Sequence, residues 1–388
     1  MEKEFKFPDG FLWGSATSSY QVEGGIENND WAEAARNGKV PAAGRACDHY
    51  NRYEEDFDIA RSLGQNAHRF SIEWARVEPE EGKFDEGAIE HYRKVLMALK
   101  ERGLEPFVTL WHFTLPLWFS RMGGFENKKA PFYFARYCEY VVSKLGGESR
   151  FWITINEPMI YVGQGYGRGI WPPFKKGNFI KLFKVAGNLI TSHNVAYEKI
   201  KKVDSNLQIG IAKNNINFEA NNNPINRLVS RLSIWFWNHR FLKKIKQDFI
   251  GVNYYFHKKF GESSKYEKSD LDWDIYPKGI YNTLMELKRY HRPVYITENG
   301  IADAADTRRD KYIQDHLRWV GRAIHDGIDV RGYFYWSLLD NFEWAHGFEP
   351  RFGLVEMNYD TMERKVRASA YEYKKICESN SLILDSRF

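Results

Sequence analysis

Two acidic residues, each at the end of a short apolar run, are the residues of this chain best placed to do chemistry. Residues 293–297 predict a buried strand, and Glu298 follows it directly before an Asn-Gly turn. Residues 151–155 are a second apolar run, which leads into Asn156 and Glu157 before a proline stops the strand. An ionised carboxylate is costly to bury unless it is paired, so each Glu is either half of a structural ion pair or held for a reaction. The repetition of the pattern favours a pair of reacting carboxylates.

Two carboxylates at one site suit the cleavage of a glycosidic bond. One must be protonated, to give its proton to the leaving oxygen, and the other ionised, to meet the positive charge at the sugar carbon. Their surroundings set these roles, because an apolar wall and a nearby like charge raise the pKa of a carboxyl. If Arg69 and Tyr255 point at Glu298, they keep it anionic. A double displacement further requires the two carboxyl groups to lie about 5.5 Å apart or less.

The elements that must position these residues alternate along the chain. Apolar strands are predicted over residues 11–17, 67–74, 105–111, 151–155, 207–213, 248–255, 293–297 and 330–337. Helical patterns are predicted over residues 56–63, 88–102, 131–145, 188–202, 225–246, 280–290, 312–326 and 369–379. This alternation is typical of a parallel sheet with helical crossovers.

Eight such units favour an α/β fold closed into a (β/α)₈ TIM barrel, rather than an open sheet. Polar and aromatic residues fall at or just past the predicted strand ends, where a barrel brings them to one mouth: Gln21, His112, Asn156, Glu157, Asn253, Tyr255, Glu298 and Trp336. No Gly-rich dinucleotide fingerprint follows a strand. Without a linker or an internal repeat, residues 1–388 are expected to form a single catalytic domain.

Composition narrows the classes of partner. The net charge of +5 comes from Lys and Arg in short scattered groups, which predict solvated faces and no nucleic-acid binding. No run approaches the roughly 20 apolar residues of a membrane span, and the N-terminus lacks a signal peptide's apolar core. Three cysteines without metal or redox spacing fit a reduced cytoplasm. The histidines show no metal-ligand spacing, so neither a metal nor another cofactor is expected.

Several motifs together resemble glycoside hydrolase family 1. Thr154-Ile-Asn-Glu-Pro158 and Ile296-Thr-Glu-Asn-Gly300 are similar to that family's acid/base and nucleophile signatures. The similarity extends in the same order to Phe7-Pro-Asp-Gly-Phe-Leu-Trp-Gly14, Ala67-His-Arg-Phe-Ser-Ile72, Trp111-His112, Trp336-Ser-Leu-Leu-Asp-Asn-Phe-Glu-Trp344 and Arg351-Phe-Gly-Leu354. It covers nearly the whole chain and implies a β-glycosidase of the β-glucosidase type.

The resemblance also implies roles. Glu157 would be the acid/base and Glu298 the nucleophile of a retaining reaction. Glycone hydroxyls would be held by Gln21, His112, Asn156, Glu343 and Trp344, above Trp336 as an aromatic platform, while Asn253, Tyr255 and Arg69 would hydrogen-bond the nucleophile and the 2-hydroxyl. Members that act on 6-phosphorylated sugars lack a carboxylate at the position of Glu343, so an unphosphorylated terminal β-linked glucoside, galactoside or fucoside is expected.

The chain departs from the family pattern at a few positions. Met159 and Phe113 stand where many members have Trp, and Thr114 stands where Asp is common. The chain is several dozen residues shorter than most members, chiefly around residues 221–246 and 260–270.

Two other hypotheses use the same residues. A transglycosylase would pass the sugar to an acceptor other than water, and a non-catalytic sugar-binding barrel would bind without cleaving. The sequence leaves the oligomeric state open, and the expected partner is a small β-glycoside or oligosaccharide.

Overall fold

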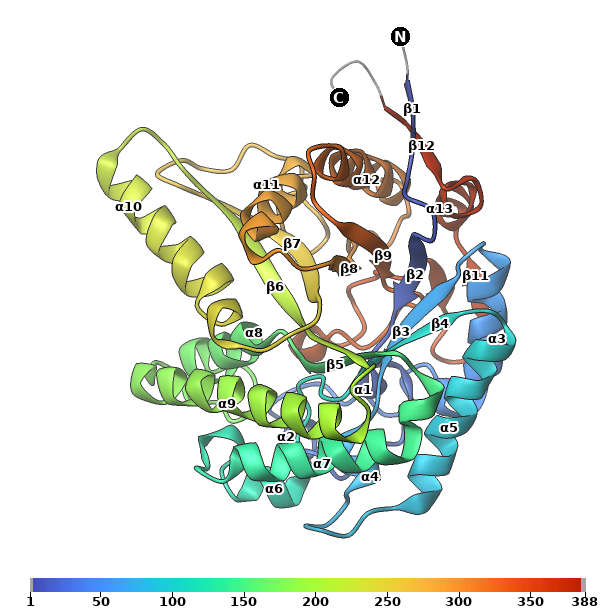
Figure 1. Cartoon of the computed structure of the whole chain (residues 1–388), viewed down its shortest axis with the longest axis vertical. Helices are drawn as coiled ribbons and strands as arrows, with labels where there is room; N and C mark the ends of the chain where they lie inside the picture. Colours follow the sequence, from blue (N-terminus) through green and yellow to red (C-terminus); the bar gives the residue numbers. More distant parts are fainter. Residues whose placement is uncertain (1–2, 385–388) are drawn as a thin grey trace.

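Eight parallel strands close into a barrel at the centre of the computed structural model, which describes residues 3–384 (Figure 1). Each strand pairs with the next one along the chain, and the last pairs with the first. The barrel strands are β2 (Leu12–Ala16), β3 (Ala67–Ser71), β4 (Glu105–Thr109), β5 (Phe151–Asn156), β6 (Gln208–Ala220), β7 (Ile250–Phe260), β8 (Val294–Asn299) and β9 (Val330–Trp336). The predicted (β/α)₈ barrel is therefore confirmed.

The longer helices form the outer layer, as Figure 1 shows. One follows each barrel strand: α3 (His49–Ser62), α5 (Glu86–Glu101), α7 (Ala130–Leu145), α9 (Phe179–Val203), α10 (Pro224–Ser233), α11 (Lys278–Leu287), α12 (Arg309–His325) and α13 (Ala368–Ser379). Local signals set their ends: the Asp85 side chain accepts a hydrogen bond from the Ala88 amide at the start of α5. The buried face of α5 carries the predicted apolar residues, including Ile89, Tyr92 and Leu99.

Shorter elements occupy the connections. Short α-helices are α1 (Ser19–Val22), α2 (Asp30–Arg36), α4 (Trp74–Val77), α6 (Leu117–Arg121) and α8 (Pro158–Val162). Single turns of 3₁₀ helix are η1 (Gly124–Glu126), η2 (Gly146–Glu148), η5 (Leu242–Lys244), η6 (Lys288–Tyr290) and η7 (Trp344–His346), and π-helical turns are η3 (Gly163–Arg168) and η4 (Ile234–His239). Two antiparallel pairs lie outside the barrel, β1 (Lys3–Lys6) with β12 (Ser381–Leu384) and β10 (Val355–Met357) with β11 (Arg364–Val366).

The largest errors of the sequence prediction lie between β5 and β7. The prediction ends the strands at 213 and 255, but β6 and β7 stay paired as far as Ala220 and Phe260. Asn214 and Asn215, just past the predicted strand end, continue the strand beside β7, because tertiary context overrides local propensity. Helix α9 begins nine residues before the predicted residue 188. The region 225–246 is mostly helical, as predicted, and consists of α10, the adjoining π-helical η4 and the 3₁₀ turn η5.

Aromatic side chains fill the barrel interior below its mouth. The rings of Phe107 and Phe151 stack with centroids 4.2 Å apart, and Phe249, Tyr295 and Phe334 pack around them. All five side chains are buried. Because this layer closes the interior, the side chains nearer the carboxyl ends of the strands form the floor of the open end.

The exits of β8 and β9 lie in direct backbone contact. A Cβ atom added at Gly300 would lie 1.7 Å from the Trp336 carbonyl oxygen, so only glycine fits there. This contact brings Glu298 and Trp336 to the same part of the mouth. No helix within residues 3–384 is both long enough and apolar enough to cross a membrane.

Candidate active site

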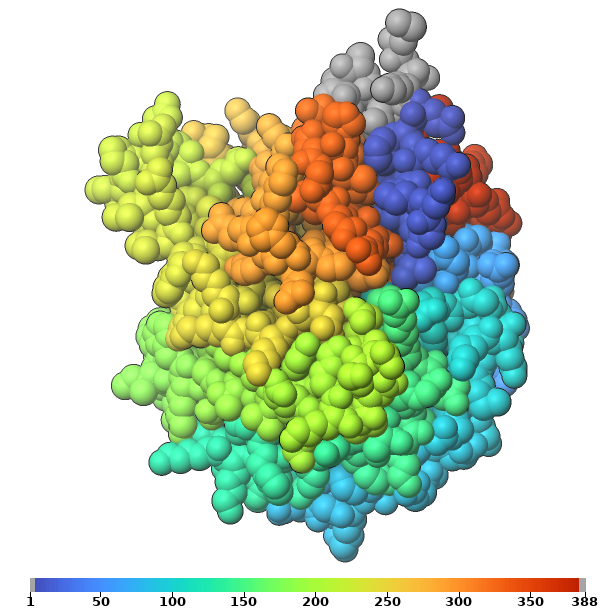
Figure 2. Space-filling model, in the orientation of Figure 1, coloured from blue at the N-terminus to red at the C-terminus, as the bar shows by residue number. Residues whose placement is uncertain are grey.

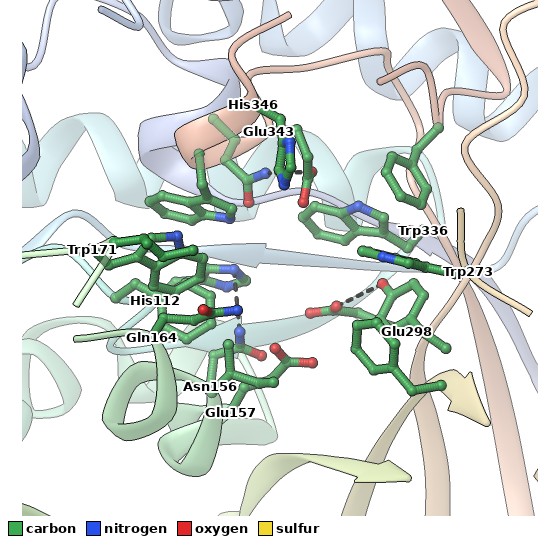
Figure 3. Close-up of a pocket in the computed structure, with 18 of the residues that line it drawn as sticks. His112, Asn156, Glu157, Gln164, Trp171, Trp273, Glu298, Trp336, Glu343 and His346 are labelled. Carbon is green, nitrogen blue, oxygen red and sulfur yellow. Dashed lines mark hydrogen bonds between the residues drawn. The ribbon is translucent and has the colours of Figure 1, made fainter. Parts of the chain in front are cut away.

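A pocket of about 710 Å³, open to solvent, lies at the carboxyl ends of the barrel strands (Figure 3). Nine of the eleven predicted site residues line it: Gln21, His112, Asn156, Glu157, Tyr255, Glu298, Trp336, Glu343 and Trp344. The other two, Arg69 and Asn253, are completely buried beneath it and contact residues that line it. The fold thus brings together every residue that the sequence predicted for the site.

Glu298, near the end of β8, is held by a cation and a phenol. The Arg69 guanidinium donates to its Oε1 at 2.5 Å, and the Tyr255 hydroxyl donates to its Oε2 at 2.8 Å. Arg69 is itself fixed, because it also donates to the Thr109 hydroxyl at 3.1 Å and to the side-chain Oδ1 of Asn156 at 2.7 Å. Both carboxylate oxygens of Glu298 therefore have a directed donor, one of them charged.

Glu157 lies one residue past β5 and has neutral partners instead. Its Oε1 accepts hydrogen bonds from the Asn253 amide at 2.9 Å and the Asn214 amide at 3.3 Å. Its backbone is in the left-handed region, with φ of +42°, and its amide donates to the Ala212 carbonyl at 2.7 Å. Such a conformation costs a non-glycine residue roughly 1–3 kcal/mol and is concentrated at functional sites. Figure 3 shows the result, with the carboxyl groups of Glu157 and Glu298 facing each other across the pocket.

Burial raises the pKa of both carboxyls, and their different partners then make the two pKa values unequal. Burial, followed by the negative charge of Glu298, raises the pKa of Glu157 to about 8. Burial also raises the pKa of Glu298, but the Arg69 charge and the Tyr255 hydrogen bond oppose it. Because only Glu298 contacts a cation, we assign the proton of the pair to Glu157 and the negative charge to Glu298.

His112 presents a free donor at the opposite wall. The Asn156 amide donates to its Nε2 at 3.2 Å, which makes Nε2 the acceptor of a neutral ring and puts the proton on Nδ1. Burial, with a smaller effect of Arg69, holds the pKa of His112 well below its usual range, so the ring stays neutral. Nδ1 is buried and has no hydrogen-bond partner among the described residues. It is therefore free to bind a polar ligand atom.

Glu343 and Gln21 line the same wall. The Gln21 amide donates to the Glu343 carboxylate at 3.3 Å and to the Phe342 carbonyl at 2.9 Å. Burial raises the pKa of Glu343 to about 8, helped by the charges of Glu298 and Glu157. The rings of Trp336 and Trp344 each lie 6.0 Å from His112 and within 15° of parallel to it. The wall therefore combines flat apolar faces with hydrogen-bonding groups, the composition of a sugar-binding surface.

The positions that depart from the family pattern have structural roles. Met159 is buried and does not line the pocket, whereas its neighbour Ile160 does. Phe113 lines the pocket with φ of +76°, and the Thr114 hydroxyl donates to the buried Glu73 carboxylate at 2.9 Å.

The sequence prediction missed ten other residues that line the pocket. These are Phe113, Ile160, Gln164, Arg168, Ile170, Trp171, Phe256, Trp273, His346 and Phe352. Most of them come from connections rather than from strand ends, so the strand-end criterion could not find them. The clusters of Trp and Pro at 171–173 and of Trp at 273 are the sequence signals that mark them. The sequence prediction also does not identify Asn214 as a contact of Glu157.

Comparison with known proteins places this chain in a family. The family model described as glycosyl hydrolase family 1 matches residues 3–231 and 216–382. Beta-glucosidase A from Acetivibrio thermocellus is 36% identical over 442 aligned positions, which span 96% of this chain and 98% of that protein.

Solved structures agree with this assignment. A beta-glycosidase from Pyrococcus horikoshii is 42% identical, with a TM-score of 0.92 over 98% of this chain and 96% of that one. A family 1 β-glucosidase from Thermotoga maritima is 33% identical, also with a TM-score of 0.92, over 97% and 99% of the two chains. The chain therefore belongs to glycosyl hydrolase family 1, and it is an O-glycosyl hydrolase.

Proposed function

We propose that the protein is a retaining β-glycosidase that removes terminal, unphosphorylated β-linked sugars by double displacement. The observation that carries this proposal is the pair of facing carboxyls with contrasting partners, Glu298 on a cation and Glu157 on two amides. Such a pair supplies an ionised nucleophile and a protonated acid at the same pH.

In the first step, a Glu298 oxygen forms a bond to the anomeric carbon as the bond to the glycosidic oxygen breaks. Glu157 transfers its proton to that oxygen, so the aglycone leaves as a neutral alcohol. The product is a glycosyl ester on Glu298, and Glu157 is left ionised. After burial, the negative charge of Glu298 is the second cause that raises the pKa of Glu157. Because the ester on Glu298 is uncharged, the pKa of Glu157 falls in this step.

In the second step, the ionised Glu157 takes a proton from water while the water oxygen attacks the anomeric carbon. The ester bond breaks, Glu298 recovers its negative charge and the sugar leaves with its original β-configuration. Arg69 and Tyr255 orient the Glu298 carboxylate throughout, and Asn156, Asn253 and the 2-hydroxyl of the sugar complete the hydrogen-bonding network around it.

The proposed glycone subsite is the wall formed by Gln21, His112, Glu343, Trp344 and Trp336. The free Nδ1–H of His112 offers a donor to hydroxyls, Glu343, held by the Gln21 amide, offers an acceptor, and Trp336 offers a face for the ring to stack on. Glu343 also supports an unphosphorylated sugar, because its carboxyl offers a 6-phosphate no positive charge and repels it when ionised. Phe256 and Trp273, whose rings pack beside that of Tyr255, would then contact the aglycone.

The test uses nitrophenyl β-glycosides with the complete chain. We expect hydrolysis of the β-glucoside, little hydrolysis of its 6-phosphate, and release of the β-anomer first, as followed by NMR. Glu298→Gly and Glu157→Ala should each abolish most activity. The matched control is Glu105→Ala, which removes a carboxylate from the opposite end of β4 and should leave the rate unchanged.

Some outcomes would contradict the proposal. Release of the α-anomer would make the enzyme inverting, and full activity in both Glu variants would remove them from the reaction. A transglycosylase, which uses the same residues, would instead show glycosylated alcohol as its main product when an alcohol acceptor is added. Binding of cellobiose without hydrolysis would indicate a non-catalytic barrel.

Two further proposals concern the chain as a whole. A single catalytic domain over residues 1–388 is supported by the pairing of β1 with β12, which joins the two ends of the described chain; residues 1–2 and 385–388 lie outside the described residues. A cytoplasmic location is supported by Cys47, Cys138 and Cys377, which are all buried free thiols.

A further inference from the structure

Large apolar side chains are exposed together on one side of the molecule, away from the barrel axis. They come from the first turns of α9 and from α10 with the adjoining η4, and we call them the apolar ridge. Ile180 is 84% exposed and Ile225 is 71% exposed. The ridge comprises Phe179, Ile180, Phe183, Ile225, Leu228, Val229, Leu232 and Trp235.

Helix α10 separates its apolar residues from the face that packs on the protein. It contacts the extended ends of β6 and β7, with Ser230 buried toward them, and Figure 2 shows it projecting from the body at the upper left. At about 100° per residue, the ridge residues of α10 and Trp235 fall within an arc of about 120°. Arg227 and Arg231 lie beyond that arc and are exposed. The helix is therefore amphipathic on its free side, where no element of the described chain covers the apolar arc.

The α9 and α10 parts of the ridge are physically connected. The Phe183 ring of α9 packs against the Phe236 ring of η4 with centroids 5.6 Å apart. The Arg240 guanidinium lies 4.7 Å from the Phe183 centroid and 5.4 Å from that of Phe236. The two helices thus present one continuous surface.

The chain segments that carry the ridge contain charged side chains of a single sign. Residues 158–197 and 220–247 contain eleven Lys and Arg and neither Asp nor Glu. Other segments supply acids for some of them: Glu126 pairs with Lys175 and Lys181, and Glu198 pairs with Lys246. In the part of the chain that the structure describes, the following exposed cations have no ion-pair partner: Lys176, Lys184, Arg227, Arg231, Lys243 and Lys244.

These features fit a lipid surface better than a second copy of the chain. A symmetric dimer would place the same patch on both sides of the interface, so cations would face cations at its rim. Anionic headgroups would instead neutralise the rim while the apolar side chains enter the boundary with the acyl chains. At ten residues, α10 is too short to span a bilayer and long enough to lie in its surface.

We propose that the apolar ridge docks this enzyme on the surface of an anionic lipid bilayer, with α10 lying in the interface plane. The inference is independent of the proposed reaction, because no ridge residue lines the catalytic pocket.

Co-sedimentation of the complete chain with vesicles tests the proposal. One set of vesicles is phosphatidylcholine alone and the other contains phosphatidylglycerol as well. We expect binding to the anionic set, weakened by salt, and a loss of at least about tenfold in partitioning for Leu228→Gln with Leu232→Gln and for Arg227→Glu with Arg231→Glu. The matched control is Lys94→Glu with Met97→Gln on α5, which alters an exposed cation and an exposed apolar side chain elsewhere.

Hydrolysis of a nitrophenyl β-glycoside in solution shows, independently of vesicle binding, whether each variant is folded. All three double variants should keep wild-type activity there, which distinguishes failure of docking from failure of the proposed function. The proposal is overturned if the wild type stays in the supernatant with both vesicle sets, binds both equally, or binds as well after the ridge changes. It is also overturned if analytical ultracentrifugation shows a dimer that the Leu228→Gln, Leu232→Gln variant dissociates.

Discussion

Glu298 and Glu157 stand at equivalent ends of two barrel strands, yet their carboxyl groups meet different partners. Both are almost fully buried, at 4% and 7% exposure, so burial alone would raise the pKa of each. Glu298 receives a guanidinium and a hydroxyl, whereas Glu157 receives two neutral amides. The difference between an ionised and a protonated carboxyl at this site therefore comes from the neighbouring donors rather than from solvent access.

The donors to the two carboxyls come from strands at different positions around the barrel. Asn253 and Asn214 reach Glu157 from β7 and β6, the strands that follow β5 around the ring. Arg69 reaches Glu298 from β3, across the barrel, and its long side chain is held on the way by Thr109 and Asn156. A closed ring makes the second arrangement possible, because only there do strands far apart in order share one interior.

Loss of the nucleophile should have the largest effect. Glu298→Gly removes the group that forms the covalent intermediate, so we expect kcat to fall by at least about 10⁴-fold. Azide can then take the empty place of the carboxylate and attack the substrate directly, which yields an α-glycosyl azide. NMR of the product checks this expectation, and a β-glycosyl azide would exchange the roles of the two residues.

Loss of the acid Glu157 should lower the rate less than loss of Glu298, and azide should restore turnover through a different product. Glu157→Ala removes the proton donor, and we expect a loss of about 10²–10⁴-fold on substrates with poor leaving groups. With a good nitrophenyl leaving group the first step still proceeds, and azide intercepts the glycosyl ester to give a β-glycosyl azide. Wild-type rates on poor leaving groups would contradict the assignment.

Removal of the Arg69 cation would make the two carboxyls more alike. In Arg69→Met, Glu298 loses its charged partner and its pKa rises, so the acid limb of the kcat/KM profile should move to higher pH. We expect activity to fall by about 10²-fold, the scale for one preorganised electrostatic partner. Tyr255→Phe removes one hydrogen bond to Glu298 but keeps the Arg69 cation, so it should lower the activity less than Arg69→Met. Denaturant unfolding separates this effect from instability, and an unmoved acid limb in a folded variant would contradict it.

Whether the sequence predicts a site residue depends on the element that carries it: a residue at a strand end is easier to identify than one within a strand or in a connection. Glu157, Glu298 and His112 follow short apolar strands, a local pattern that needs no knowledge of the fold. Arg69 lies within a strand, and its role was predicted on the condition that the side chain points at Glu298, which the structure satisfies.

Other parts of the molecule depend on contacts that no local pattern reveals. Trp171 and Trp273 come from connections whose course depends on the packing of neighbouring loops. Asn214 lies in a strand that continues past an Asn-Asn pair because β7 continues beside it. That same extension carries α10 away from the body. The sequence predicts residues 225–246 as mostly helical and the basic groups as solvated, but it does not predict that the apolar side chains of the ridge are exposed.

We expect the smallest effect from removal of the Asn214 side-chain amide, which donates a hydrogen bond to Glu157. Because Glu157 must be protonated in the first step, activity should decline as pH rises through about 8, the value to which burial raises the pKa of its carboxyl. The Asn214 amide donates to the ionised form and so lowers that pKa. In Asn214→Ala the pKa of Glu157 should rise, and the alkaline limb of kcat/KM should move up by about half a pH unit, with kcat changed less than about threefold.

The neighbouring residue provides the control for this last measurement. Asn215 is also buried, but its side-chain amide has no hydrogen-bond partner among the described residues. Asn215→Ala should therefore leave the alkaline limb where it is. An alkaline limb that stays fixed in Asn214→Ala, or moves to lower pH, would show that this amide does not stabilise the ionised acid. The contrast between the two carboxyls would then depend on Arg69 and Tyr255 at Glu298 and on Asn253 at Glu157.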